Sequence, residues 1–145
     1  MSVPFRFDTV LRIRETERDG KRLALALGQA REATLRADRD RIAEERRHAL
    51  DELRTLQAAS GWTAEQALTR QQHAQHLARE LAIAEAALSE AIGQSALQHL
   101  ELLEADTAVK ALEKLADRHH TDQAKADHAH DERDHGDIRH PGRAA

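Results

Sequence analysis

Residues 77–116 of this chain have the sequence LARELAIAEAALSEAIGQSALQHLELLEADTAVKALEKLA. One set of positions within it recurs at alternating steps of four and three residues, and every member except Ser95 and Gln98 is apolar. A repeat of about 3.5 residues keeps one seam facing a neighbouring helix over many turns, which forces a left-handed supercoil. The stretch therefore predicts a long helix that packs along another helix in a coiled coil. The twelve seam positions are Leu77, Leu81, Ala84, Leu88, Ala91, Ser95, Gln98, Leu102, Ala105, Val109, Leu112 and Ala116.

The composition suits a thin coiled coil and argues against several other classes of protein. The chain has 145 residues, of which 33% are charged and 2% are aromatic, so it has too little bulky apolar matter for a multilayered globule. The net charge of −4 argues against nucleic acid as a partner, because neutralising phosphates needs a basic face. There is no cysteine, no apolar run that would span a bilayer, and no secretory signal at the start. We therefore expect a cytoplasmic protein without direct membrane insertion.

One interior break divides the chain into two helical segments. Gly61 suits the left-handed end of a helix, and Thr63 with Gln66 forms the pattern of a capping box that begins the next one. Trp62 is expected to fold back on Ala67 as a hydrophobic staple. The break therefore predicts a tight turn, and a short connection makes neighbouring helices antiparallel.

The expected fold is all-α, with two long helices forming an antiparallel coiled-coil hairpin over residues 1–135. Phe7 then lies opposite about Leu115, and everything after Arg118 overhangs as a polar C-terminal arm. Residues 136–145 are expected to be a disordered tail. The hairpin is expected to consist of a first helix over about 8–59 with Asp8 as its N-cap, a turn over about 60–63 and a second helix over about 64–134.

The first helix carries a thinner seam than the second. Its predicted seam residues are Leu35, Ile42, Ala49, Leu53 and Leu56. Residues 6–58 have a net charge of +2 from 13 basic and 11 acidic side chains, whereas residues 63–118 have a net charge of −4 from 5 basic and 9 acidic ones. Opposite signs on facing helices favour the hairpin over the pairing of like helices. We therefore expect a monomer of marginal stability.

Four motifs occur in order along the chain. They are Phe5-Arg6-Phe7 with Val10-Leu11 and Arg14, the turn with Trp62, Lys110-Ala111-Leu112-Glu113-Lys114-Leu115, and Asp131-Glu132. In this order, and at these distances from the termini, they resemble the FliJ family, the small cytosolic coiled-coil component of the flagellar export apparatus. The resemblance covers nearly the whole chain.

This resemblance implies an antiparallel two-helix protein, similar to the central stalk of rotary ATPases, that acts as a stalk or chaperone in flagellar type III export. The implied partners are the flagellar export ATPase and its regulator, the cytosolic domain of the export gate, and substrate chaperones. The implied location is the cytoplasm, with peripheral association to the cytoplasmic face of the cell membrane through these partners. The family has no catalytic residues, and no cofactor is expected.

The resemblance also implies a charged partner-binding surface near the open end of the hairpin. Its residues are Arg12, Arg14, Lys110, Lys114, Arg118, Asp131 and Glu132. Without the resemblance, the same charges fit an ordinary solvated face. The arm departs from the family in its many histidines, and His128 stands where a lysine is expected.

The residues themselves argue against catalysis and against a specific metal site. No glycine-rich loop with a following lysine is present to cradle a phosphate, so the chain is not expected to be an ATPase. Histidines and aspartates alternate in the arm, but an overhanging arm supplies no fixed ligand geometry, so no metal site is expected. We expect instead that the arm becomes more positive at acidic pH. Its histidines are His119, His120, His128, His130, His135 and His140.

Two other functions fit a coiled coil. A prefoldin-like or general chaperone would hold unfolded clients at apolar tips, which the hydrophilic arm disfavours. A homodimeric structural spacer would use the seam in a parallel pair, which the mid-chain turn and the opposite helix charges disfavour.

Overall fold

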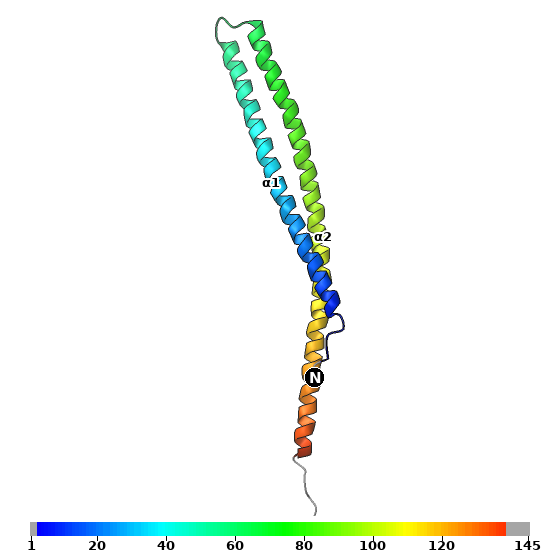
Figure 1. Ribbon diagram of the computed structural model, residues 1–145. Coiled ribbons are helices and arrows are strands. Elements are labelled where there is room, and N and C mark those ends of the chain that lie inside the picture. The colour runs from blue at the N-terminus through cyan, green and yellow to red at the C-terminus, as the bar shows by residue number, and fades with distance from the viewer. Residues whose placement is uncertain (1–2, 139–145) are drawn as a thin grey trace, which may run out of the picture. The chain divides into compact units, whose positions relative to one another are not determined.

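Two long helices make up almost all of the structure. The computed structural model describes residues 3–138, with α1 at Asp8–Ala58 and α2 at Ala64–Ile138. Within that range there is no strand. On either side of the turn that joins them, the two helices run side by side in opposite directions (Figure 1). The predicted all-α helical hairpin is confirmed.

The chain forms two compact units. The turn unit is Arg22–Leu100, and the terminal unit combines Met1–Lys21 with Glu101–Ala145. Each unit pairs a stretch of α1 with a stretch of α2, so each has its own part of the coiled-coil seam.

The turn has the geometry that its sequence predicts. Gly61 has a φ of +83°, in the left-handed region that residues without a Cβ adopt readily. The backbone N–H of Thr63 donates to Gln66 Oε1 at 3.1 Å, and the backbone N–H of Gln66 donates to Thr63 Oγ1 at 3.2 Å. These reciprocal bonds are a capping box, as predicted. α1 ends at Ala58, one residue before its predicted end.

The seam of α2 is covered along its whole predicted length. Each of the twelve predicted positions, from Leu77 to Ala116, is buried or half-buried. Val109 is the most deeply buried, at 0% exposure. The same alternating steps continue through Ala74 and Arg70 to Ala67 on the turn side, and to His119 and Gln123 on the other side. Ala74 is buried and Arg70 is exposed, whereas Ala67, His119 and Gln123 are half-buried. The seam is longer than predicted because its outermost positions hold small or polar residues that an apolar pattern does not mark.

The seam of α1 is thin because charged residues occupy many of its positions. Glu32, Arg39 and Arg46 lie at heptad positions between the apolar ones, and all three are half-buried. Arg39 pairs with Asp40 at 2.7 Å, and Glu32 pairs with Arg36 at 3.0 Å. Their long stems cover the seam while the charged ends remain at its edge. The predicted seam residues are all buried or half-buried, namely Leu35, Ile42, Ala49, Leu53 and Leu56.

Ion pairs between the helices report the register in each unit. In the turn unit, Arg70 Nη1 lies 2.8 Å from Glu52 Oε2. In the terminal unit, Lys21 Nζ lies 2.9 Å from Glu101 Oε2. The two members of each pair are equally far from Gly61 along the chain. The register is therefore the one expected from a hairpin that turns at this glycine.

The helices of the turn unit approach closely at Gly28. A Cβ at this position would collide with the side-chain amide of Gln98 and would lie 3.4 Å from Ser95 Oγ. Ser95 Oγ and Gln98 Oε1 are buried without a hydrogen-bond partner in the described part of the chain. This layer of the seam is therefore polar, and it depends on the missing side chain of Gly28.

α2 extends beyond its predicted end near Asp134. It continues through Gly136 to Ile138. The first three residues of the predicted tail at 136–145 are therefore helical, and residues 139–145 lie outside the described range.

Candidate interaction site in the terminal unit

The N-terminal strap, Val3–Phe7, lies against α2 and closes the end of the seam. The Val3 carbonyl oxygen accepts a hydrogen bond from Gln123 Nε2 at 3.1 Å and lies 3.0 Å from His119 Nε2. The Phe5 ring lies 5.6 Å from the His119 ring and 5.9 Å from the Phe7 ring, measured between centroids. His119 and Gln123 are the two polar residues that extend the seam of α2. The strap is therefore a cover for the last seam positions.

This contact corrects the predicted start of the overhanging arm. Arg118 was expected to be the last residue of α2 opposite α1, and the strap instead reaches as far as Gln123. From Ala124 to Asp137 every described residue is exposed. We call residues 124–138 the C-terminal arm. The arm is shorter than predicted because the chain before α1 folds back onto α2.

The Lys21–Glu101 pair holds the other end of the terminal unit. Glu101 raises the pKa of Lys21 above its ordinary value of 10.5, chiefly through their side-chain hydrogen bond and then through its negative charge. Both side chains are about half exposed, so the pair orients the two helices more than it stabilises them.

Three of the predicted partner-binding residues share one face of α2. Lys110, Lys114 and Arg118 follow at steps of four, and Lys125 falls on the same face seven residues further along. All four are exposed. Lys110 pairs with Asp106 at 2.9 Å, whereas the other three have no ion-pair partner among residues 3–138. These four residues form the basic stripe, of which Lys125 was not predicted.

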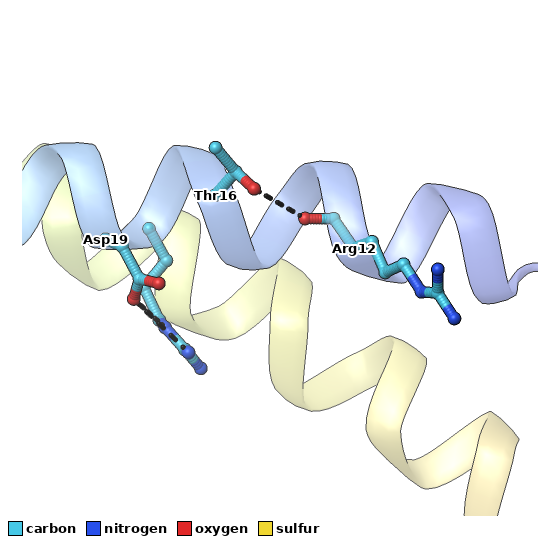
Figure 2. Close-up of polar contacts among 4 residues, drawn as sticks. Arg12, Thr16 and Asp19 are labelled. Carbon is cyan, nitrogen blue, oxygen red and sulfur yellow. Dashed lines mark hydrogen bonds and ion pairs between the residues drawn. The ribbon is translucent and has the colours of Figure 1, made fainter.

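The two predicted arginines of α1 do not share a face. Thr16 Oγ1 donates to the Arg12 carbonyl oxygen at 3.0 Å, and Figure 2 shows the Arg12 side chain running along α1. Its guanidinium lies 3.1 Å from Asp8 Oδ2. Arg14, two residues on, points elsewhere and pairs with Glu17 at 3.0 Å. Asp8 is the first residue of α1, and its carboxylate binds this arginine.

The two predicted acidic residues lie on the C-terminal arm. Glu132 pairs with His128 at 3.4 Å, and the carbonyl oxygen of Asp131 lies 2.8 Å from His135 Nδ1. A similar pair joins His130 to Asp134 at 3.0 Å. Each contact spans one helical turn, so the arm's side-chain pairs are local to it.

The protein-family comparison adds the decisive observation. The family described as the flagellar FliJ protein matches residues 2–138, which include both helices, the turn and the arm. The chain belongs to the FliJ family. A comparison with curated proteins found no match, and a comparison with solved structures also found none.

Membership of the FliJ family makes this a protein of flagellar export. Its helical hairpin fits the coiled coil expected from the resemblance. No helix of residues 3–138 is long and apolar enough to cross a membrane. In the same range, no three histidine, aspartate or glutamate side chains lie close enough together to hold a metal ion.

Two features of this candidate site were not predicted from the sequence. Lys125 was missed because Asp122 interrupts the steps of four, although a step of seven finds it. The strap was missed because its anchor is a backbone oxygen, that of Val3, and no side-chain pattern reveals it. The charges of the site fall on at least three separate faces, so only the basic stripe is a contiguous surface.

Proposed function

We propose that this protein is a non-enzymatic, stalk-like component of the flagellar type III export apparatus. It engages the ring of the export ATPase and couples that ring to the cytosolic domain of the export gate. The regulator of the ATPase and substrate chaperones are further partners. The protein works in the cytoplasm and associates with the cytoplasmic face of the cell membrane through these partners.

The basic stripe is the observation that carries this proposal. Lys114, Arg118 and Lys125 point outward on one face of α2 without an ion pair in the described chain, although the protein is acidic overall. Most other lysines and arginines within residues 3–138 have a partner, as Lys110 has in Asp106 and Arg41 has in Glu45. A cluster of unneutralised cations on a net-negative chain is suited to an acidic partner surface.

The stripe continues into the C-terminal arm, which has no covering element among residues 3–138. A helix that is polar on every side gains little from packing within its own chain, so a partner is the natural source of its stability. Contacts of this kind set orientation and association rate more than affinity, and salt weakens them. The coupling is therefore expected to be reversible.

Retention of purified partners tests the proposal. The wild-type chain is immobilised and mixed separately with the export ATPase and with the cytosolic domain of the gate. A triple variant with Lys114→Glu, Arg118→Glu and Lys125→Glu is treated in the same way. We expect the wild type to retain both partners and the triple variant to lose at least about tenfold in affinity for one of them.

A matched charge reversal in the turn unit is the control. Arg41→Glu, Arg47→Glu and Arg54→Glu reverse the same number of exposed positive charges, three, without touching the stripe. This control is expected to bind as the wild type does. Equal retention of both partners by all three proteins would show that the stripe is a solvated face, and failure of the wild type to bind either partner would refute the stalk proposal itself.

A further inference from the structure

Large apolar residues of the turn unit lie outside its seam. Leu27 is 63% exposed on α1, and Leu97 and Ile83 are 62% and 71% exposed on α2. Neither helix of the unit uses these side chains to hold the other. Exposed apolar residues scattered singly are ordinary, so their arrangement decides whether they matter.

The exposed residues of the two helices share one side of the turn unit. Glu52 of α1 lines a groove together with Arg70 and His73 of α2, so these positions mark one side of the pair. Heptad steps of seven lead from Glu52 back to Arg31 and Ala24, which flank Leu27. A coiled coil keeps residues seven apart on the same side.

The same steps apply to α2. Steps of seven lead from His73 to Ala87 and Gln94. Glu90 lies between Ala87 and Gln94, and Leu97 follows Gln94 by three residues. We call this surface the Leu27 face. It consists of Ala24, Leu27, Arg31 and Thr34 of α1 with Ile83, Ala87, Glu90, Gln94 and Leu97 of α2.

The α1 and α2 residues of the Leu27 face lie at the same height along the hairpin, and their charges are opposite in sign. Leu27 and Leu97 lie at nearly the same distance along the chain from Gly61, and so do Arg31 and Glu90. Neither Arg31 nor Glu90 has an ion-pair partner in the described residues.

Several charged residues of the same side nearer the turn do have partners. Arg41 pairs with Glu45 at 2.9 Å, and His48 lies 3.1 Å from Glu52, which also binds Arg70. Asp38, between these pairs and the Leu27 face, also has no ion-pair partner in the described residues. Arg31 and Glu90 therefore belong to a longer stretch of this side whose charges are left without partners within residues 3–138.

We propose that the Leu27 face binds a second copy of this chain in a two-fold dimer. A two-fold axis parallel to the helices sets α1 of one protomer against α2 of the other. Leu27 then packs on the partner's Leu97, and Arg31 meets the partner's Glu90. The symmetry repeats both contacts, so one surface supplies both halves of a self-complementary interface.

A second copy fits better than an unrelated protein because the face carries both members of each pairing. The positive residue lies on one helix and the negative residue on the other, at the same level, which is the arrangement that a two-fold axis brings together. The sequence predicted a monomer because it argued against a parallel dimer that pairs through the seam. This dimer leaves the seam inside each hairpin.

The size of the face sets the strength of the dimer. Its α1 part, residues 24–34, is about 16 Å long at about 1.5 Å per residue. Stable interfaces commonly bury about 800 Å² on each partner, which is more than so short a surface provides. We therefore expect association in the range of tens of micromolar or weaker, with the charge pairs setting its orientation.

Analytical ultracentrifugation of the full chain tests the proposal. Over a concentration series up to about 1 mM, the wild-type mass should rise from 16.3 kDa towards twice that value. Leu97→Asp should weaken association at least tenfold. Leu68→Asp is the matched control, since Leu68 is also a half-exposed leucine of α2 and lies outside the face. Helix content by circular dichroism should be unchanged in both, because neither side chain is buried.

A charge swap tests the pairing itself. Arg31→Glu should weaken the dimer by repulsion from the partner's Glu90, and adding Glu90→Arg should restore it. A wild type that remains monomeric throughout, or a Leu68→Asp variant that weakens association as much as Leu97→Asp, would overturn the proposal. Failure of the double variant to recover would also overturn it, because the proposed symmetry requires that contact.

Discussion

α2 contains two stretches that are both helical but are stabilised by different interactions. From Ala67 to Gln123 one face is covered by α1 or by the N-terminal strap, whereas residues 124–137 of the C-terminal arm are all exposed. The first stretch is stabilised by packing in its seam, and the second by pairs one turn apart such as His130–Asp134. Local pairs contribute only about 0.2–0.5 kcal/mol each. A helix in this protein therefore has very different stability according to whether its seam is occupied.

The sharpest test of this contrast is a charge placed in each stretch. Val109→Asp puts an unpaired carboxylate at a fully buried seam position, and it should lower the free energy of unfolding by more than about 3 kcal/mol. Ala129→Asp makes the same kind of change in the exposed arm and should cost less than about 0.5 kcal/mol. Urea unfolding followed by circular dichroism measures both. Equal midpoints for the two variants would contradict the contrast.

Two glycines of α1 test the seam at a finer scale. Gly28→Ala gains about 1 kcal/mol of helix propensity but must push the flexible end of the Gln98 side chain aside in a close layer, so it should stabilise the protein less than Gly20→Ala does. Gly20 has open space around it, so Gly20→Ala should stabilise the helix by up to about 1 kcal/mol. Thermal unfolding of both variants gives the comparison. The close approach at Gly28 would be disproved by a rise in stability like that of Gly20→Ala.

The strap marks the boundary between the two stretches. Phe5→Ala removes the ring that contacts His119 and Phe7, and it should cost about 1 kcal/mol of local stability. Hydrogen exchange of the backbone amides at residues 115–123 measures this loss. Val3→Ala is the control, because Val3 contributes its carbonyl oxygen and its side chain is 64% exposed. Equal exchange rates in both variants would show that the Phe5 ring does not stabilise this end of the seam.

The smallest effect is expected in the arm. Glu132→Gln removes the carboxylate that His128 contacts, so it should lower the stability of the arm helix by up to about 0.5 kcal/mol. Carbon chemical shifts of residues 128–135 report the helix population. Asp127→Asn, at a carboxylate without a partner in the described chain, is the control and should change it less.

Part of the candidate site was predicted, and that part came from the family resemblance. The sequence predicted Lys110, Lys114 and Arg118 as partner-binding residues through the family resemblance, and the structure brings those three together on one face. It did not predict that Arg12 and Arg14 diverge, although two residues on a helix differ by about 200° and the divergence follows from that angle. Whether any of these residues binds a partner stays a prediction. The expected change of arm charge with pH also stays a prediction.

The amino-acid pattern alone was enough for the two helices, the capping box at Thr63 and the register about Gly61. These depend on periodicity and on contacts within a few residues, which a linear sequence states directly. Only the tertiary structure decided that Val3 binds His119 and Gln123, that Gly28 admits Gln98, and that Leu27 and Leu97 share one exposed side. Each of these joins residues far apart in the chain through a backbone oxygen, a missing side chain or a common level on two helices. Such features exist only once the second helix lies beside the first.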